Sequence, residues 1–454
     1  MSADYVAPIK AEFIIRPSNS SCHDDQEKRN GTVEANSKPV GKNSDLAADL
    51  TTTANLNRQY DVRGLATTSK VSAPCLDVNE QTKFFSTYKS VQSSDGNETD
   101  VERPWRNRMD VKGKLYLAPL SKIGTLPFRR ICVDFGADIT CTKMVKASDV
   151  LKEDSFDWAL VKRHSSEKHF GVQLCGASAD EMAKAAEILL NKIEVDFLDI
   201  NAACPRRAVW ETGAGYALVN DTSRLGDIVK AMRSVINDMP LTIKFRKGLS
   251  HEPLKVVKNF DVDLITMHGR TKDQPDTELS DWDYVGQCAK AVHPLPLVGV
   301  GDVLSYTDYY HYLDAYSVAA VMIARGAMIK PWIFTEIREK RHWDIAASER
   351  LEILRRFANY GLEHWGSDQE GVSRTRYFLL EWMSFLYRYI PVGLLEYLPQ
   401  RMVDRFPRYF GRNDLETLMA SDRYDDWIKI SEMFLGPAPD GFQFVPKHKP
   451  HSYL

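Results

Sequence analysis

From Lys114 onward, short apolar runs rich in β-branched residues alternate with stretches of helical periodicity, which leaves few folds open. Such alternation is typical of βα units around a parallel sheet. The strand-like runs are Lys114–Leu120, Ala137–Thr142, His169–Cys175, Val195–Ala202, Leu241–Arg246, Val262–Gly269, Leu295–Gly301 and Ala319–Gly326. Eight such runs in about 215 residues predict an α/β fold of one closed TIM (β/α)8 barrel.

A doubly wound open sheet is the competing α/β architecture. Its first strand should lead into a glycine-rich phosphate turn that opens a helix. The residues after Leu120 read SKIGTLP and contain no GxGxxG pattern. The sequence therefore favours the closed barrel.

The flanks of the barrel differ from it in composition. Residues 1–110 are rich in Ser, Thr, Asn, Asp and Lys, which predicts a largely disordered N-terminal extension. We assign 111–340 to the barrel and 341–435, which has helical periodicity and no strand-like alternation, to an all-α domain. Residues 436–454 form a basic C-terminal tail.

Composition narrows the class of protein without identifying it. A net charge of −3 argues against a uniformly basic nucleic-acid coat but leaves room for a local basic face. The seven cysteines are scattered without metal-site spacing, so we expect a reduced intracellular protein with no structural metal. No signal sequence and no run of 18 apolar residues is present, so neither secretion nor membrane insertion is expected.

Polar residues and glycines follow most of the predicted strands, at the barrel end where reactive groups sit. They are Gln173, Asn201, Cys204, Lys244, Arg246, His268, the Gly299–Asp302 turn, Arg325 and Gly326. The two glycine turns and Arg325 predict a phosphate site, unless the glycines merely turn the chain. Lys244, in an apolar strand, predicts an anionic partner such as a flavin edge, unless its head reaches solvent.

His268 and Cys204 are less decisive alone. A histidine at a strand end suits a phosphate or a carbonyl group, but it can equally be structural. A loop cysteine can donate a proton, since its ordinary pKa of about 8.5 keeps it protonated near neutrality, but most loop cysteines are inert.

Taken together, the motifs resemble those of the dihydrouridine synthase family. They are Leu117–Leu120 (LAPL), Gly171–Leu174 (GVQL), Asp199–Pro205 (DINAACP), Lys244–Arg246 (KFR), His268–Arg270 (HGR) and Ile323–Gly326 (IARG). Four further segments resemble the eukaryotic branch of the family, which reduces uridine 47 of tRNA. They are Trp343–Ile345, Tyr360–Asp368, Pro391–Glu396 and Asp426–Met433. The resemblance runs from about Arg103 to Tyr453.

The resemblance implies a flavin-dependent reduction of uridine to 5,6-dihydrouridine. A hydride would pass from reduced FMN to C6, Cys204 would give a proton to C5, and NADPH would reduce the flavin again. The residues carried over as FMN contacts are Ala118, Pro119, Leu120, Gln173, Lys244, His268, Val300, Gly301, Asp302, Ala324 and Arg325. Asn201 would orient the uracil, and Arg246 would also contact the substrate.

The chemistry requires a uridine that has left its stack, so a second RNA-binding surface is expected. Between Ala346 and Leu435 the chain has eleven arginines and one lysine, several beside aromatics. We predict RNA contacts for Arg374, Arg376 and Arg388, although acidic residues nearby could pair with some arginines. The expected partner is tRNA, with messenger RNA open as a second substrate. We expect a monomer in the cytoplasm, the nucleus or both.

The sequence departs from the family pattern at several places. Ala203 and Ala214 replace glycines, which predicts a stiffer loop, and Lys143 replaces a glutamate. The segment Leu249–Asp261 is shorter than the family's helix, and residues 1–110 lack the zinc fingers usual in the eukaryotic form. A catalytically impaired tRNA-binding homologue is therefore the alternative. A flavin barrel acting on a small pyrimidine, such as a dihydroorotate dehydrogenase, would lack the arginine-rich helical domain.

Overall fold

The structure is a computed structural model that describes residues 109–152, 155–248, 257–404 and 406–446. Three expectations fall wholly or partly outside these residues. They are the disordered N-terminal extension without zinc fingers, the short segment after Leu249, and the end of the basic tail.

Eight parallel strands close into a barrel. They are β1 (Tyr116–Leu117), β2 (Ile139–Cys141), β4 (His169–Cys175), β5 (Phe197–Ala202), β6 (Leu241–Arg246), β7 (Leu264–His268), β8 (Leu297–Val300) and β9 (Ala320–Ile323). Neighbours along the chain pair with each other, β2 pairs with β4, and β1 pairs with β9 to complete the ring. The predicted TIM barrel is confirmed and the open sheet is excluded. One short strand that we did not predict, β3 (Val145–Lys146), pairs with the end of β4.

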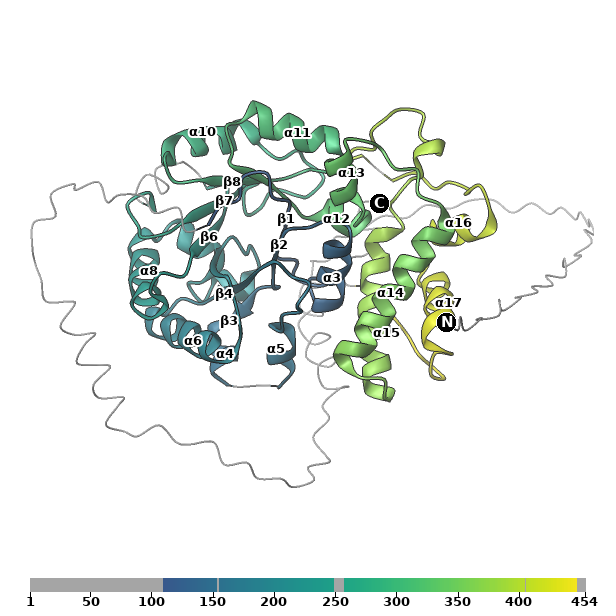
Figure 1. Cartoon of the computed structure of the whole chain (residues 1–454), viewed down its shortest axis with the longest axis horizontal. Helices are drawn as coiled ribbons and strands as arrows, with labels where there is room; N and C mark the ends of the chain where they lie inside the picture. The colour runs from purple at the N-terminus through teal and green to yellow at the C-terminus, as the bar shows by residue number, and fades with distance from the viewer. Residues whose placement is uncertain (1–108, 153–154, 249–256, 405, 447–454) are drawn as a thin grey trace, which may run out of the picture. The chain divides into compact units, whose positions relative to one another are not determined.

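The strands read as continuous apolar runs because helices cover their outer face (Figure 1). The helices along the barrel are α3 (Leu126–Asp134), α4 (Ala147–Leu151), α5 (Ser155–Leu160), α6 (Ala179–Lys192), α8 (Thr222–Ile236), α10 (Trp282–Val292), α11 (Tyr306–Ala315), α12 (Arg325–Ile329) and α13 (Ile333–Glu339). The loop after β5 contains the short helices α7 (Arg207–Trp210) and η1 (Gly215–Val219). Side-chain oxygens of Ser178, Asp221, Asp281 and Ser305 accept backbone N–H groups where α6, α8, α10 and α11 begin.

The C-terminal region is helical, as predicted. It consists of α14 (Ala347–Trp365), α15 (Gln369–Leu386), η2 (Val392–Leu394), α16 (Asp414–Met419) and α17 (Tyr424–Leu435). Helix α14 packs on α3 of the barrel, and α15 packs on α12 and α17 (Figure 1). The indole of Trp382 on α15 donates to the carbonyl of Met328 at 2.9 Å. Buried apolar side chains of the barrel and of these helices form one continuous cluster.

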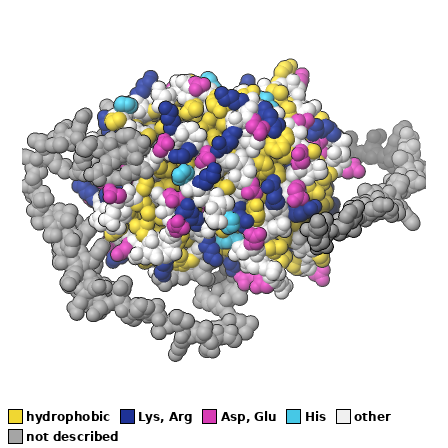
Figure 2. Space-filling view, viewed as in Figure 1, with side chains coloured by type: hydrophobic (Ala, Val, Ile, Leu, Met, Phe, Trp, Pro, Cys, Tyr) yellow, Lys and Arg dark blue, Asp and Glu magenta, His cyan; other side chains and the backbone are white. Residues whose placement is uncertain are grey.

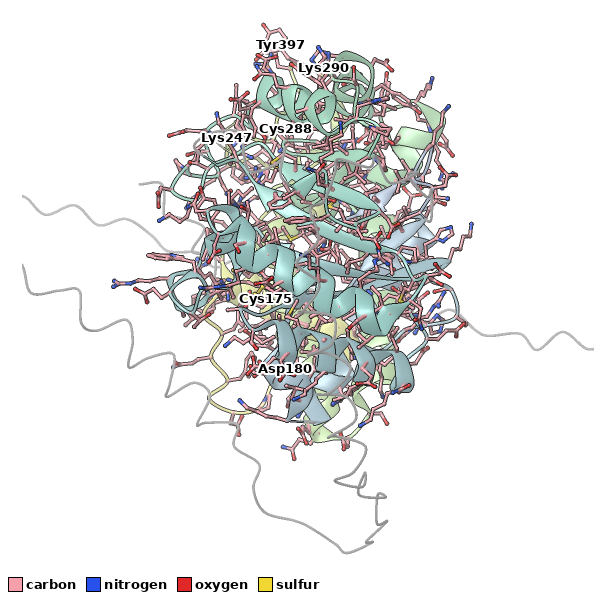
Figure 3. The ribbon with its side chains drawn as sticks, turned by 90° about the vertical axis from the view of Figure 1, so that its left-hand side faces the viewer. Cys175, Asp180, Lys247, Cys288, Lys290 and Tyr397 are labelled. Atoms are coloured by element: carbon pink, nitrogen blue, oxygen red, sulfur yellow. The ribbon has the colours of Figure 1, made fainter. Side chains whose placement is uncertain are left out.

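Four of the cysteines are buried, as predicted: Cys132, Cys141, Cys175 and Cys288. Cys288 lies on α10 on the same side of the molecule as Lys247 (Figure 3). Basic and acidic side chains are interspersed on the face seen in Figure 2. Among the described residues no helix is long and apolar enough to cross a membrane.

Candidate active site

The register of the parallel strands aligns the polar residues of β4, β5, β6 and β7. Gln173 pairs with Asp199, and Asp199 pairs with Thr242. Two residues nearer the carboxyl ends, Asn201 pairs with Lys244. Two residues further on, Arg246 pairs with His268. The barrel therefore brings five of the sequence-predicted site residues to one end.

A chain of hydrogen bonds crosses this end from β6 to the loop after β5. Thr242 Oγ1 donates to Asp199 Oδ1 at 2.5 Å, and Gln173 Nε2 donates to Asp199 Oδ2 at 2.6 Å. Asn201 Nδ2 donates to Gln173 Oε1 at 2.8 Å. Asn201 Oδ1 then accepts the backbone N–H groups of Ala203 at 3.1 Å and Cys204 at 2.9 Å.

Asp199 and Thr242 are absent from the predicted site residues. The available signal was spacing, because residues two apart in a strand face the same side and Asp199 lies two before Asn201. The bonds also limit what Asn201 can do. Its oxygen accepts two backbone N–H groups and one Nδ2 hydrogen binds Gln173, so one Nδ2 hydrogen remains for a ligand.

Cys204 lies half-buried just past β5. It packs against a small cluster that includes Cys175, and its carbonyl accepts the N–H of Tyr216 at 3.1 Å. The alanines that replace family glycines fit this loop without strain. Ala203 has a negative φ and Ala214 has a φ of −99°, whereas the left-handed positions are held by Gly213 and Gly215.

Positive charge gathers at the ends of β6, β7 and β9. Burial, and then the charges of Arg246, Lys244, Arg270 and Arg325, hold the pKa of His268 well below its ordinary value. Burial, followed by Arg246, also lowers the pKa of Lys244 to about 8, against the opposing pull of Asp199. Four cations thus converge on a neutral histidine, which suits an anionic group.

The glycines at the end of β8 pack closely against neighbouring side chains. A Cβ on Gly301, whose φ is 156°, would lie 2.3 Å from Ser280 Oγ. A Cβ on Gly299 would lie 2.4 Å from the Trp282 ring. These positions exclude larger residues because Ser280 and Trp282 fill the space, and a phosphate contact at this turn stays a prediction.

Asp302 follows that turn and binds two arginines. Its carboxylate accepts from Arg270 Nη2 at 2.6 and 2.8 Å and from Arg325 Nη2 at 2.9 Å. The side chain of Asp302, which we predicted as a cofactor contact, thus orients Arg270 and Arg325. Arg270 belongs to the HGR motif but was not among the predicted site residues, and it is fully buried.

The remaining predicted cofactor contacts lie at the same end of the barrel. Ala118, Pro119 and Leu120 follow β1, and the N–H of Ala118 donates to the carbonyl of Ile323 at 2.9 Å. Val300 is the last residue of β8, and Ala324 precedes α12. Their contacts with FMN stay predictions.

The predicted RNA contacts, Arg374 and Arg376 on α15 and Arg388 just after it, separate into two kinds. Arg374 pairs with Glu370 and lies near the Trp365 ring, and Arg388 lies near the Phe385 ring; both are partly exposed. Arg376 is only 1% exposed. It donates to Ser431 Oγ at 2.7 Å and to the carbonyls of Leu435, Gly436 and Pro437. The prediction of an RNA contact was wrong for Arg376, because its guanidinium fastens α15 to the end of α17.

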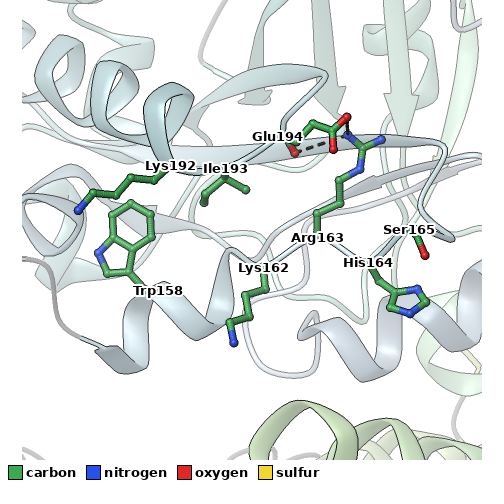
Figure 4. A pocket seen from close by; sticks show the side chains of 8 residues that line it. All are labelled: Trp158, Lys162, Arg163, His164, Ser165, Lys192, Ile193 and Glu194. Atoms are coloured by element: carbon green, nitrogen blue, oxygen red, sulfur yellow. Dashed lines mark hydrogen bonds and ion pairs between the residues drawn. The ribbon is translucent and has the colours of Figure 1, made fainter.

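A hollow of about 630 Å³ lies at the opposite end of the barrel (Figure 4). It is lined by residues that precede β4 and β5, among them Trp158, Lys162 and Lys192. Arg163 in its wall is bonded to Asp196 at 2.9 Å and to the carbonyl of Glu167 at 3.0 Å. This hollow is separate from the strand ends where the motif residues meet.

Comparison with known proteins gives consistent matches. The model of the family Dihydrouridine synthase (Dus) matches residues 116–378. A tRNA-dihydrouridine(47) synthase-like protein of Rattus norvegicus is 55% identical over 77% of this chain and 55% of its own. A similarly named protein of Oryza sativa subsp. japonica is 50% identical over 76% of this chain and 51% of its own. The chain thus spans about half the length of the curated relatives it matches.

Solved structures match more remotely. A 2-naphthoyl-CoA reductase aligns with a TM-score of 0.42 and 11% identity, over 51% of this chain and 51% of that chain. A likeness at this level does not bear on function. The family match, in contrast, contains every strand of the barrel and extends into α15. With relatives at about half identity, it shows that this chain belongs to the dihydrouridine synthase family.

Proposed function

We propose that this chain reduces uridine to 5,6-dihydrouridine in tRNA, at position 47, with FMN as cofactor and NADPH as reductant of the flavin. One observation carries the proposal. Arg246 pairs with His268 in the sheet register, and Arg270 Nη1 lies 3.3 Å from His268 Nε2. Arg325 shares the carboxylate of Asp302 with Arg270, and all of these groups lie at the same end of the barrel as the half-buried Cys204. The names of the relatives support tRNA as the substrate.

The residues at the strand ends fit a phosphorylated flavin. Arg325 and the narrow Gly301 turn would hold the phosphate, and Lys244 would face the electron-rich edge of the ring. Bound FMN would supply the hydride for C6 of the uracil. His268, whose pKa is lowered by burial and then by its cationic neighbours, stays neutral and would offer hydrogen bonds without adding another charge.

Cys204 would give the proton to C5. Its backbone is fixed by Asn201 on one side and by Tyr216 on the other, so the thiol is presented from a defined loop. The remaining Nδ2 hydrogen of Asn201 would bind a uracil carbonyl. Arg206, exposed two residues after Cys204, would meet the RNA backbone.

The test measures dihydrouridine by mass spectrometry in an unmodified tRNA transcript incubated with the protein, FMN and NADPH. Cys204→Ala is compared with Cys288→Ala, which removes a buried thiol on α10. We expect product at position 47 with the wild type and Cys288→Ala, and a rate at least about 100-fold lower with Cys204→Ala. A wild type that binds FMN and tRNA but forms no dihydrouridine would refute the proposal in favour of a catalytically impaired RNA-binding protein.

A further inference from the structure

The hydrogen bonds that connect Asp199 to the backbone of Cys204 pass through the side-chain amides of Gln173 and Asn201. The orientation of both amides follows from the bonds that Asn201 makes to the backbone. The backbone N–H groups of Ala203 and Cys204 can only donate, so the atom of Asn201 that faces them must be its oxygen. The Nδ2 group of Asn201 therefore faces Gln173, whose facing atom must be Oε1. This leaves Gln173 Nε2 directed at position 199.

Position 199 must therefore supply an acceptor. The carboxylate of Asp199 is buried, with 3% exposure, and accepts from Gln173 on one oxygen and from Thr242 on the other. An apolar residue there would leave a buried Gln173 N–H without a partner. Gln173 would then be free to turn, and a turned Gln173 would set its own N–H group against that of Asn201.

We propose that Asp199 is a positioning residue, whose carboxylate fixes the amide orientations of Gln173 and Asn201 and thereby holds the backbone of Cys204 where its thiol can give up a proton. The inference rests on the proposed role of Cys204. Asp199 itself contacts the loop only through two intervening side chains. Its effect should therefore be larger on the step that uses Cys204 than on the flavin, although some loss of FMN affinity is expected as well, because Gln173 is also a predicted FMN contact.

Two substitutions separate the acceptor from the charge. Asp199→Leu is similar in size and removes both. Asp199→Asn removes the charge but keeps an acceptor for Gln173, because the new amide oxygen can face Gln173. The new amide nitrogen then faces Thr242, whose hydroxyl can donate toward the carbonyl of Leu198, 3.5 Å away. Asp263→Leu is the matched control. It removes another buried carboxylate, which binds Arg233 at 2.6 Å at the start of β7.

The first measurement needs no catalysis. The holoprotein is treated with iodoacetamide, and alkylation of the peptide that contains Cys204 is followed by mass spectrometry. We expect the alkylation rate to rise about tenfold in Asp199→Leu, because the released loop exposes the thiol, and to stay within about twofold of wild type in Asp199→Asn and Asp263→Leu. A rate in Asp199→Asn as high as in Asp199→Leu, or no change in Asp199→Leu, would overturn the proposal. If Asp199→Leu does not fold, Asp199→Ala, which removes the same acceptor with a smaller side chain, takes its place with the same expected rise, and no rise would overturn the proposal.

The second measurement follows the flavin through each half of the reaction. Both halves are measured with FMN in excess, so that any weaker binding of FMN is compensated. Reduction of bound FMN by NADPH should slow by no more than about threefold in Asp199→Leu, whereas its reoxidation by tRNA should slow by about 10- to 100-fold. Equal slowing of both halves would indicate a merely structural residue and overturn the inference. A wild type that makes no dihydrouridine would instead remove the proposed function, and the alkylation rates would still test the link from Asp199 to Cys204.

Discussion

Lys244 gives the binding of FMN a predictable dependence on pH. In the protein without cofactor, burial and the nearby Arg246 lower the pKa of Lys244 to about 8. Below that pH the side chain carries its charge, and above it the charge is lost. The electron-rich edge of the flavin would favour the charged form and raise the pKa again, so binding above pH 8 must be coupled to the uptake of a proton.

The size of the effect follows from that pKa. With a pKa of about 8, the charged fraction of Lys244 falls from about 90% at pH 7 to about 10% at pH 9. The affinity for FMN should therefore fall about tenfold over this range. His268 adds nothing, because its pKa lies well below its ordinary value and it stays neutral throughout. The phosphate of FMN, with a second pKa of about 6, also keeps its charge.

Titration of apoprotein with FMN, followed by flavin fluorescence at pH 7, 8 and 9, would measure this dependence. Lys244→Met is the control. It should bind FMN more weakly at pH 7 and with a nearly flat pH profile, and any ionisation of the flavin itself would appear in both proteins. If the wild type were as flat as Lys244→Met, the placement of Lys244 against an anionic group would be refuted.

Two further predictions concern stability. Arg376→Met should lower the free energy of unfolding by about 2–4 kcal/mol, because Ser431 and three carbonyls after α17 lose a charged donor, while the tRNA affinity of the folded protein stays the same. Urea unfolding and a binding assay at low temperature would check this, and weaker tRNA binding without a loss of stability would contradict it. Glu167→Ala should cost about 3–5 kcal/mol, since it leaves the buried Arg129 without its partner at 2.7 Å. Burial alone would raise the pKa of Glu167, but Arg129 and the hydrogen bonds hold that pKa below its ordinary value. The difference in unfolding free energy from wild type should therefore be full at neutral pH and shrink as the pH falls below about 4. A difference that stays constant through that range of pH would contradict the assignment.

The sequence predicted the barrel well because each strand is a compact, continuous apolar run, and such runs between helical stretches can be recognised without tertiary context. β3 escaped prediction because two residues, Val145 and Lys146, carry no period at all. Arg374 and Arg376 illustrate a different limit. Both look alike in sequence, but a separation of two residues turns them about 200° around α15. Only the position of α17 decides which one is buried.

Asp199 was missed, and Asp302 was predicted as a cofactor contact and not as a partner of two arginines, for a related reason. Each lies within or beside a motif, and a carboxylate in a motif can contact a ligand or support a neighbour. The choice depends on which donors surround it in space. In the structure Asp199 faces an amide and a hydroxyl, and Asp302 faces two guanidinium groups.

The shared core of the barrel and the C-terminal helices has a mechanical consequence. Trp382 of α15 is buried against Phe128 of α3 and bonded to Met328, and Tyr360 of α14 bonds to Asp134 of α3. A hinge between the two regions would have to open this packing to water. Anything bound to the C-terminal helices is therefore kept at a constant distance from the strand ends of the barrel. Selection among nucleotides of a folded RNA would then depend on how far each one lies from the bound portion.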